Sequence, residues 1–406
     1  MEDNRRIRVA ITHGDTNGIG YELIFKTFAA PEMLELCTPI IYGSPKVATY
    51  HRKALDIPAS FSIINDAREA REGRVNLLTC MGDEIKVELG VPTPESNQAA
   101  MQALDRAISD YRNGLFDVLV TCPVDERHLE SGGVKFGSQQ AYIETCLGEG
   151  RSVLPVYVGD ALTVALVTDN LALRDVPQAL TPARLEERIG CFYNTLRRDF
   201  RLSNPRVAVL SLNPDNGEFG NFDREEQEVI APTVSKLAEN GVNVFGPYSA
   251  DEIFSGSTAD AFDGLLAMYH DQGLPPFKAR EASEGVRLMA GLSVVCTAPE
   301  SNVAFSIAGR NVADETAFRH AIFLAIDVWR NRQEYDEPLA HPLKKLYHEK
   351  KDDSEKVRFS IPKKHENAIL ERAPKTAPTP APSAQPAQPA PEATDGGEEQ
   401  QQQQDE

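Results

Sequence analysis

The stretch that decides the fold is Arg6–Gly20, RIRVAITHGDTNGIG, in which a short apolar segment runs into a loop with three glycines. Residues 6–12 are predicted to form a buried strand, and YELIFKTFAAPEML after the loop has the apolar spacing of a helix. CTPIIYGS then predicts a second strand, and Pro45 opens a further helix. Strand, loop, helix and strand in this order form the repeating unit of a parallel α/β sheet.

The same unit recurs along the rest of the chain. Each later apolar run ends in small or polar residues, as expected where strands lead into functional loops. Thr181 and Pro182 have the pattern of an N-cap and a first helical residue. The predicted strands are 116–124, 162–170 and 205–213, and the predicted helices are 97–114, 181–200, 222–241 and 314–336. The fold class predicted from this pattern is α/β.

Composition excludes several classes of protein. Acidic residues outnumber basic ones by 61 to 42 among 406 residues, a net charge of −19, which argues against nucleic-acid and membrane-surface partners. Six cysteines are scattered without a CxxC pair, as is typical of reduced thiols in a cytosolic protein. The chain opens on MEDNRRIRVAI rather than on an apolar leader, so we expect a cytoplasmic protein.

The C-terminal segment differs in composition from the rest. Residues 373–406 contain seven of the 27 prolines, five consecutive glutamines, six acids and one lysine. Such a segment cannot bury apolar surface and is predicted to be a disordered tail. It carries −5 of the net charge, so residues 1–372 remain acidic at −14. Residues 337–372, rich in lysine and weakly patterned, are predicted to form a surface extension.

Several loops contain residues able to take part in chemistry, and most of them are ambiguous on their own. The glycine loop matches neither the dinucleotide nor the phosphate-binding spacing, so a ligand loop and a tight structural turn both remain open. Ser138 and Gln139 follow TCPV (121–124) as candidate substrate contacts or as an ordinary helix start. Asp215 and Glu218 offer oxygen ligands to a hard cation or form a plain Asn-Pro-Asp turn.

The string MYHDQGLPPFK (268–278) is the most informative of these. It places His270, Asp271 and Lys278 within nine positions, in what the glycine and two prolines predict to be an irregular loop. Loops that carry such groupings are more often functional than structural. His270 is therefore a candidate site residue.

Taken in order, these strings resemble the family of 4-hydroxythreonine-4-phosphate dehydrogenases, the NAD-dependent enzymes of pyridoxal phosphate biosynthesis. ITHGDTNGIGYE is similar to the family's ITxGDPxGIGxE, TCPV to TGPV, LNPDNGE to LNPHAGE, and GPYSADEIF to GPxPADxxF. MYHDQGLPPFK is nearly the family's MYHDQGLPxxK. The resemblance spans residues 6–330.

The resemblance implies a fold like that of isocitrate and isopropylmalate dehydrogenases, with two α/β domains and an interdomain cleft. It implies a first domain of 1–125 with 305–336, and a second domain of 126–304 that carries much of a homodimer interface. The cofactor, NAD or NADP, is bound there without a Rossmann fingerprint. A divalent cation held by three histidines, one of them from the partner subunit, stabilises negative charge as hydride leaves and CO2 is lost.

The three metal ligands are only partly conserved in type. The family's third histidine corresponds to His270, while the second falls at Asp215 and the first at Asn170. The implied metal site is thus Asn170, Asp215 and His270. Carboxylate and amide oxygens are harder ligands than imidazole, so a retained cation is expected to shift from Zn or Co toward Mg or Mn.

The implied substrate and catalytic residues are altered in a similar way. Lys278 corresponds to the family's substrate-binding lysine, and Lys278, His270 and Asp271 are the implied catalytic residues. The family's asparagine and arginine fall at Arg287 and Cys296, so that one cation is lost and another gained near one anion site. The family's GHT becomes Gly137-Ser138-Gln139, and its Asp-His pair becomes Glu300-Ser301.

Three functions remain open from the sequence. The first is an NAD-dependent dehydrogenase that oxidises and decarboxylates 4-phosphooxy-threonine or a related phosphorylated hydroxy acid. The second is a relative with an altered substrate and metal. The third is a non-catalytic member with a binding role. Asn170 and Asp215 keep oxygen donors at the altered positions, which favours the enzyme over the inactive member.

Overall fold

The computed structural model describes residues 5–82, 84–131, 134–151, 153–214, 224–281 and 284–340. These residues belong to one compact unit, Met1–Pro342. The predicted tail, 373–406, and residues 341–372 of the predicted extension lie outside the described residues, as do Asp215 and Glu218. Within the described ranges, no helix is both long and apolar enough to cross a membrane.

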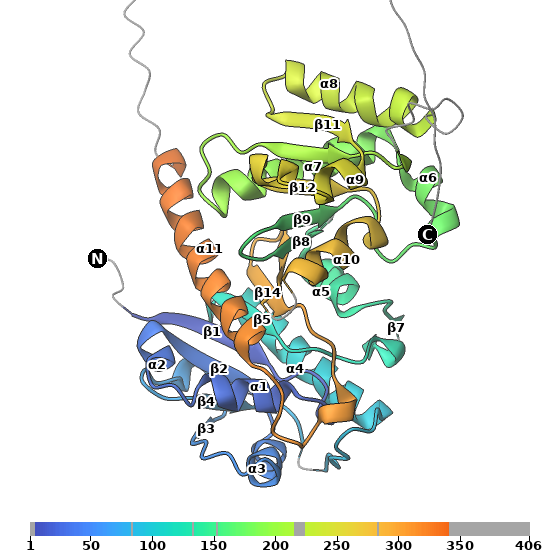
Figure 1. Cartoon of the computed structure of the whole chain (residues 1–406). Helices are drawn as coiled ribbons and strands as arrows, with labels where there is room; N and C mark the ends of the chain where they lie inside the picture. Colours follow the sequence, from blue (N-terminus) through green and yellow to red (C-terminus); the bar gives the residue numbers. More distant parts are fainter. Residues whose placement is uncertain are drawn as a thin grey trace, which may run out of the picture. The chain divides into compact units, whose positions relative to one another are not determined.

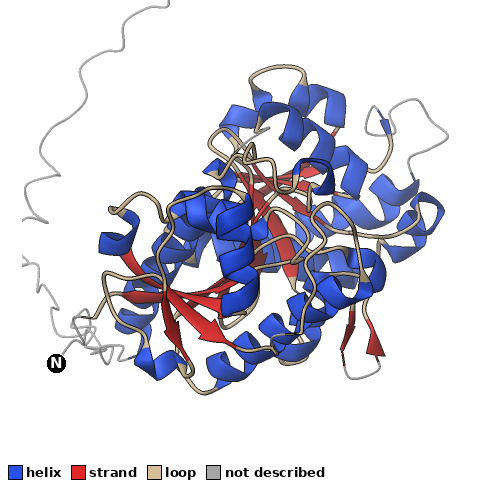
Figure 2. Ribbon diagram, turned by 90° about the horizontal axis from the view of Figure 1, so that it is seen from below, coloured by secondary structure: helices blue, strands red, loops and turns tan. Residues whose placement is uncertain are grey.

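A twelve-stranded sheet runs through the unit, in the order β11-β10-β12-β9-β8-β13-β14-β5-β1-β2-β4-β3 (Figures 1 and 2). The first wing is parallel and contains β1 (Ile7–Thr12), β2 (Cys37–Gly43), β3 (Ser62–Ile64), β4 (Asn76–Thr79), β5 (Val118–Thr121) and β14 (Val295–Pro299). The second wing, also parallel, contains β9 (Thr163–Leu166), β10 (Val207–Leu210), β11 (Val244–Tyr248) and β12 (Gly264–Ala267).

The two wings are joined by β8 (Leu154–Val158) and β13 (Val286–Ala290). Strand β13 is antiparallel to both β14 and β8, and β8 is antiparallel to β9. Because three antiparallel pairings separate them, the two parallel wings run in opposite directions. Strand β14, which the resemblance assigns to the second domain, pairs with β5 of the first, so the sheet continues across the predicted boundary. The domain limits stay a prediction.

Helices cover both faces of the sheet, as Figure 2 shows. The α/β fold class is therefore confirmed. The helices are α1 (Gly20–Thr27), α2 (Met33–Leu36), α3 (Pro45–Ala54), α4 (Pro94–Arg112), α5 (Gln139–Leu147), α6 (Val176–Ala179), α7 (Pro182–Arg198), α8 (Ala231–Glu239), α9 (Ala250–Phe254), α10 (His270–Arg280) and α11 (Thr316–Ala340). A two-stranded hairpin, β6 (Glu130–Ser131) with β7 (Val134–Lys135), lies apart from the sheet.

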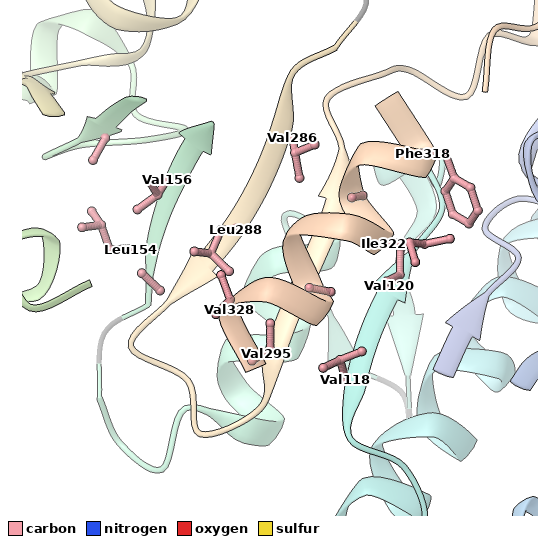
Figure 3. Packing of buried hydrophobic residues seen from close by; sticks show 14 of the residues in the cluster. Val118, Val120, Leu154, Val156, Val286, Leu288, Val295, Phe318, Ile322 and Val328 are labelled. Atoms are coloured by element: carbon pink, nitrogen blue, oxygen red, sulfur yellow. The ribbon is translucent and has the colours of Figure 1, made fainter. Parts of the chain in front are cut away.

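Helix α11 packs across the middle of the sheet. Its buried residues Phe318, Ile322 and Val328 face apolar side chains of β5, β13 and β14 (Figure 3). Burial of each large apolar side chain stabilises the fold by roughly 1.5–3 kcal/mol, so this helix holds the centre of the sheet together. It extends four residues beyond the predicted end at 336, to Ala340.

Local capping explains why several helices begin where they do. The Thr181 hydroxyl accepts a hydrogen bond from the Arg184 N–H, with Pro182 at the first helical position, so the predicted N-cap is confirmed. Ser138 caps α5 in the same way by accepting from the Ala141 N–H at 3.0 Å. The helix predicted over 222–241 begins as a π-helical turn, Glu226–Ile230, before it becomes α8.

The prediction of an irregular loop at 268–278 was wrong, because residues from His270 onward form α10. Pro275 and Pro276 lack the N–H groups that would bond to the carbonyls of Asp271 and Gln272 four residues earlier. The residues after the prolines still continue the helix, and the Glu281 N–H closes it by donating to the Phe277 carbonyl at 2.8 Å. The helix therefore tolerates two prolines in its middle.

Candidate active site

One cavity of about 470 Å³ collects most of the residues singled out from the sequence. Its lining comes from segments that follow β5 and β14 in the first wing, from segments that follow β9 and β12 in the second, and from the joining strands β8 and β13. It therefore lies where the two wings meet. The predicted residues in its lining are Ser138, Gln139, Asn170, His270, Lys278 and Arg287.

Lys278 supplies a cation at the wall of this cavity. It lies in the last turn of α10, and its side chain is 48% exposed. The Nζ atom is 2.9 Å from Oε1 of Glu300, the residue after β14, and the Glu300 side chain is only 13% exposed. The lysine is thus held by a largely buried carboxylate but keeps access to the cavity, as a group that binds an anionic ligand must.

Arg287 supplies a second cation from the floor of the sheet. It stands on β13 directly opposite Tyr157 of β8, and the two side chains are hydrogen-bonded. Burial disfavours the charge of the guanidinium, but the groups around it outweigh that cost and raise its pKa. These groups are Glu300, Tyr157, Glu126 and Asp169. Arg287 therefore stays charged inside the cavity.

Carboxylates in the lining were missed by the sequence analysis. Glu126 accepts from the Gln139 N–H at 3.2 Å, and loss of solvent contact raises the pKa of its carboxyl. Asp125 pairs with Arg127 at 2.7 Å, and Asp169 precedes the predicted ligand Asn170. No spacing rule identifies these acids, because they meet only through the pairing of the two wings. Their position at the ends of predicted strands, Asp125 and Glu126 just after 116–124 and Asp169 in the last positions of 162–170, was the one signal available in the sequence.

His270 and Asn170 come together in the lining, from α10 and from the segment after β9. The Nδ1 atom of His270 is 2.7 Å from Oδ1 of Asp271. A carboxylate only accepts hydrogen bonds, so Nδ1 carries a proton, and in the neutral imidazole the lone pair is on Nε2. A carboxylate on one ring nitrogen is the usual partner of a metal-binding histidine.

Other predicted residues stand apart from this cavity. Asp271 is exposed and contributes to it only through His270. Cys296 is fully buried in β14 and does not line the cavity; its burial raises the pKa of the thiol to about 12, against the nearby charge of Arg287. Cys296 thus offers neither exposed surface nor a thiolate to a substrate.

The donor chemistry fits a hard divalent cation better than a zinc ion held by three imidazoles. Asn170 offers an amide oxygen, Asp169 a carboxylate and His270 one imidazole nitrogen. Among the described residues, no group of three or more His, Cys, Asp or Glu side chains forms a metal site. The described donors of one chain therefore do not form a metal site by themselves, and the predicted Asp215 lies outside the described residues.

The glycine loop, His13–Gly20, is buried throughout and none of its residues lines this cavity. The Asp15 N–H donates to the Pro123 carbonyl at 3.0 Å, and the Ile19 N–H donates to the Val303 carbonyl at 3.3 Å. Pro123 and Val303 do line the cavity. The loop therefore supports the lining from behind, as a structural turn does.

Two buried histidines lie at that loop, His13 as its first residue and His51 on α3. The His13 ring stacks on Tyr21 at 5.1 Å between centroids, and His51 packs on the same tyrosine at 4.9 Å. The His51 Nε2 atom is 2.7 Å from the Thr16 carbonyl, whereas both ring nitrogens of His13 lack a hydrogen-bond partner. Burial lowers the pKa of each imidazole to about 4. Both rings are therefore neutral at pH 7.

The chain also matches known proteins in sequence. The family model described as pyridoxal phosphate biosynthetic protein PdxA matches residues 35–325. A 4-hydroxythreonine-4-phosphate dehydrogenase of Bacteroides thetaiotaomicron is 49% identical over 359 residues, which cover 88% of this chain and 98% of that protein. A protein of the same name from Geobacter metallireducens is 33% identical and covers 80% and 97% respectively.

Solved structures of proteins with this name are similar to the chain in fold. A 4-hydroxythreonine-4-phosphate dehydrogenase of Klebsiella pneumoniae superposes with a TM-score of 0.69 at 27% identity, covering 81% of this chain and 99% of that one. The Burkholderia phymatum enzyme of that name gives 0.66 at 29% identity, covering 80% and 99%. A terephthalate 1,2-cis-dihydrodiol dehydrogenase of Burkholderia xenovorans, at 0.53 and 23% identity over 80% of this chain and 98% of that one, shares the fold.

Proposed function

Because the chain belongs to the family of the pyridoxal phosphate biosynthetic protein PdxA, we propose that it oxidises 4-hydroxythreonine 4-phosphate, also called 4-phosphooxy-threonine, in pyridoxal phosphate biosynthesis. It is an oxidoreductase acting on a CH–OH group, like the relatives that carry this name. Their shared name does not favour the alternative of an altered substrate. The proposal includes NAD or NADP as hydride acceptor, a divalent cation, a homodimer and a cytoplasmic location.

The observation that carries the proposal is the pairing of two cations with hydroxyl and amide groups in one cavity. Lys278 and Arg287 face it beside Ser138 and Gln139. Guanidinium and ammonium groups bind phosphate and carboxylate through charge-assisted hydrogen bonds. A phosphorylated hydroxy acid carries both kinds of anion, so the cavity has the chemistry to orient it.

The substrate would enter in competition with the carboxylates of the cavity. Glu300 neutralises Lys278 at 2.9 Å and also acts on Arg287, so both cations share one counter-ion. An anionic group that reaches Lys278 must draw it from Glu300. A substrate with two anionic groups gains more from this exchange than a monoanion, which supports a doubly anionic substrate.

The chain's residues also account for the polarity that the reaction needs. Oxidation removes a hydroxyl proton and a carbon-bound hydride, and the keto acid formed then loses CO2. NAD, when bound, would accept the hydride, the hydroxyl proton would leave to solvent, and a divalent cation would supply positive charge for the oxygen that becomes negative. Asn170 and His270 would hold such a cation, and Asp271 would keep the His270 Nε2 atom available.

The direct test is formation of NADH by the purified full chain with 4-hydroxythreonine 4-phosphate, NAD and added Mg²⁺, Mn²⁺ or Zn²⁺. Turnover that depends on the cation, higher with Mg²⁺ or Mn²⁺ than with Zn²⁺, is the expected result. A protein that binds the substrate but yields no NADH with any of the three cations would be the non-catalytic member instead.

A further inference from the structure

Two neighbouring parallel strands of the second wing, β9 and β12, lead to the residues proposed to hold the cation, and β10 pairs with β12 on its other side. Asn170 comes four residues after the end of β9, and His270 comes three residues after the end of β12. Beyond the last ladder pairs, single backbone hydrogen bonds continue: the Val167 and Thr168 N–H groups donate to the Ala267 and Met268 carbonyls, and the Ser211 N–H donates to the Tyr248 carbonyl. Side chains add further bonds at these strand ends.

Gln272 supplies that connection with both ends of its amide. Its Oε1 atom accepts from the Met268 N–H at 2.7 Å, one residue past the end of β12. Its Nε2 atom donates to the Ser211 carbonyl at 2.6 Å, one residue past the end of β10. The side chain is buried, and both of its polar atoms are used on backbone rather than on solvent.

The connection continues to the third strand. The Thr168 hydroxyl donates to the Met268 carbonyl at 2.7 Å, and the Thr168 N–H donates to the same carbonyl at 3.1 Å. Met268 thus bonds to Gln272 through its N–H and to Thr168 through its carbonyl. One line of hydrogen bonds therefore joins the ends of β10, β12 and β9.

A buried carboxylate holds the outer end of this line. Glu226, the first residue of the π-helical turn, accepts from the Leu212 N–H at 2.7 Å and from the Asn213 N–H at 2.8 Å. Insertions of π-helix often mark functional places in helices. Here the turn fixes Leu212 and Asn213, the two residues that follow Ser211. The segment after β10 is therefore held both by Gln272, at Ser211, and by Glu226.

We propose that Gln272 is a positioning residue that clamps these three strand ends and thereby sets the placement of Asn170 and His270 in the cavity. The inference rests on the proposed function for the cation that these residues would hold. A buried apolar side chain of equal size would pack at this position without the clamp, because only the amide bonds to both Met268 and Ser211. Outer partners of this kind typically change metal affinity by about 10–100-fold when they are replaced.

The test replaces the amide without changing its volume, in Gln272→Met of the full chain. Its matched control is Asn76→Leu, which removes another buried amide, on β4, that donates to the Pro39 carbonyl at 3.1 Å, far along the sheet in the first wing. Both variants should melt at a lower temperature than the wild type. Direct titration with Mn²⁺ and amide hydrogen exchange are then measured well below both melting temperatures.

Gln272→Met should weaken Mn²⁺ binding about 10–100-fold and speed exchange at residues 168–171, 211–213 and 268–271, whereas Asn76→Leu should leave Mn²⁺ binding and these three segments unchanged. Unchanged affinity and exchange in Gln272→Met would overturn the clamp. So would an equal loss of affinity in Asn76→Leu. A wild type that takes up no Mn²⁺ would instead overturn the cation part of the proposed function, and the exchange comparison alone would then decide the clamp.

Discussion

The glycine loop and helix α10 both match the family in sequence, yet they occupy opposite sides of the cavity wall. His13–Gly20 is buried and bonded to the backs of the lining segments, while α10 presents His270 and Lys278 to the cavity itself. The two strings therefore match the family for different physical reasons. One string preserves a close backbone fit, and the other preserves groups that meet a ligand.

This contrast predicts which measurement each region controls. Substitutions in the loop should change the free energy of unfolding, because they disturb buried packing. Substitutions on α10 that face the cavity should change kinetics and leave stability nearly constant. A loop variant that alters only catalysis, or an α10 variant that alters only stability, would break the contrast.

The largest effect is expected from Lys278→Met. The change removes the ammonium that faces the cavity, and loss of a preorganised charged group at a reacting site typically lowers kcat by about 10²–10³-fold. Steady-state assays of kcat/KM measure it. The control is Lys236→Met, which removes an exposed lysine of α8 that pairs with Glu186 of α7 at 2.6 Å. A comparable loss of kcat/KM in that variant would contradict the assignment of Lys278.

Next in size is the dependence of stability on pH that comes from the buried histidines. The pKa of both His13 and His51 falls from 6.5 to about 4 on folding, so between these values the unfolded chain binds more protons. Stability from this source is complete above pH 6.5 and declines as the pH falls toward 4. At pH 5 each histidine should cost about 2 kcal/mol relative to pH 7.5.

Urea unfolding at pH 7.5, 6 and 5 measures this decline. In His51→Gln the amide can still donate to the Thr16 carbonyl, but one titrating group is gone, so about half of the histidine contribution should disappear. A pH dependence identical to that of the wild type would show that His51 does not titrate as its burial implies.

A smaller loss of stability is expected from a substitution in the glycine loop, and a comparison of two glycines distinguishes steric crowding from backbone strain. Gly14 and Gly73 both have a φ of +70°, but a Cβ at Gly14 would lie 2.2 Å from the Pro123 carbonyl oxygen, while one at Gly73 would meet nothing within 4 Å. Gly14→Ala should therefore destabilise the fold by about 1–3 kcal/mol more than Gly73→Ala. Equal melting temperatures of the two variants would refute the close fit of loop and lining.

The smallest effect is expected from Cys296→Ala. The thiol is fully buried and does not line the cavity, so KM for the substrate should stay unchanged, with a modest loss of stability from the lost side-chain volume. A clear rise in KM, measured by initial rates, would restore Cys296 to the substrate site that the resemblance gave it.

The limits of sequence reasoning are visible in particular residues. The apolar run of the first strand and the helix-start residues of α3 and α7 are local signals, and the fold follows them. These elements were therefore predictable from the sequence. Helix α10 was missed because packing of its buried residues, such as Leu274 and Phe277, outweighs two prolines, which is a tertiary effect. The neighbours of Arg287 were also hidden, since the facing of Arg287 and Tyr157 depends on the pairing of β13 with β8.

The altered positions teach the same lesson. The spacing alone left open a transfer of positive charge from position 296 to position 287. In the structure Arg287 enters the cavity lining while Cys296 remains buried nearby, close enough for the arginine charge to act on its thiol. Burial and strand facing, rather than spacing, separate the two positions.

Equilibrium binding of 4-hydroxythreonine 4-phosphate, measured by titration calorimetry on the wild type and on Arg287→Met, tests the assignment of this cavity most directly. The account predicts saturable binding by the wild type and binding weakened at least about tenfold in the variant, because a charge-assisted hydrogen bond contributes about 1.5–3 kcal/mol. Equal affinity of the two proteins, or no binding by the wild type, would contradict it.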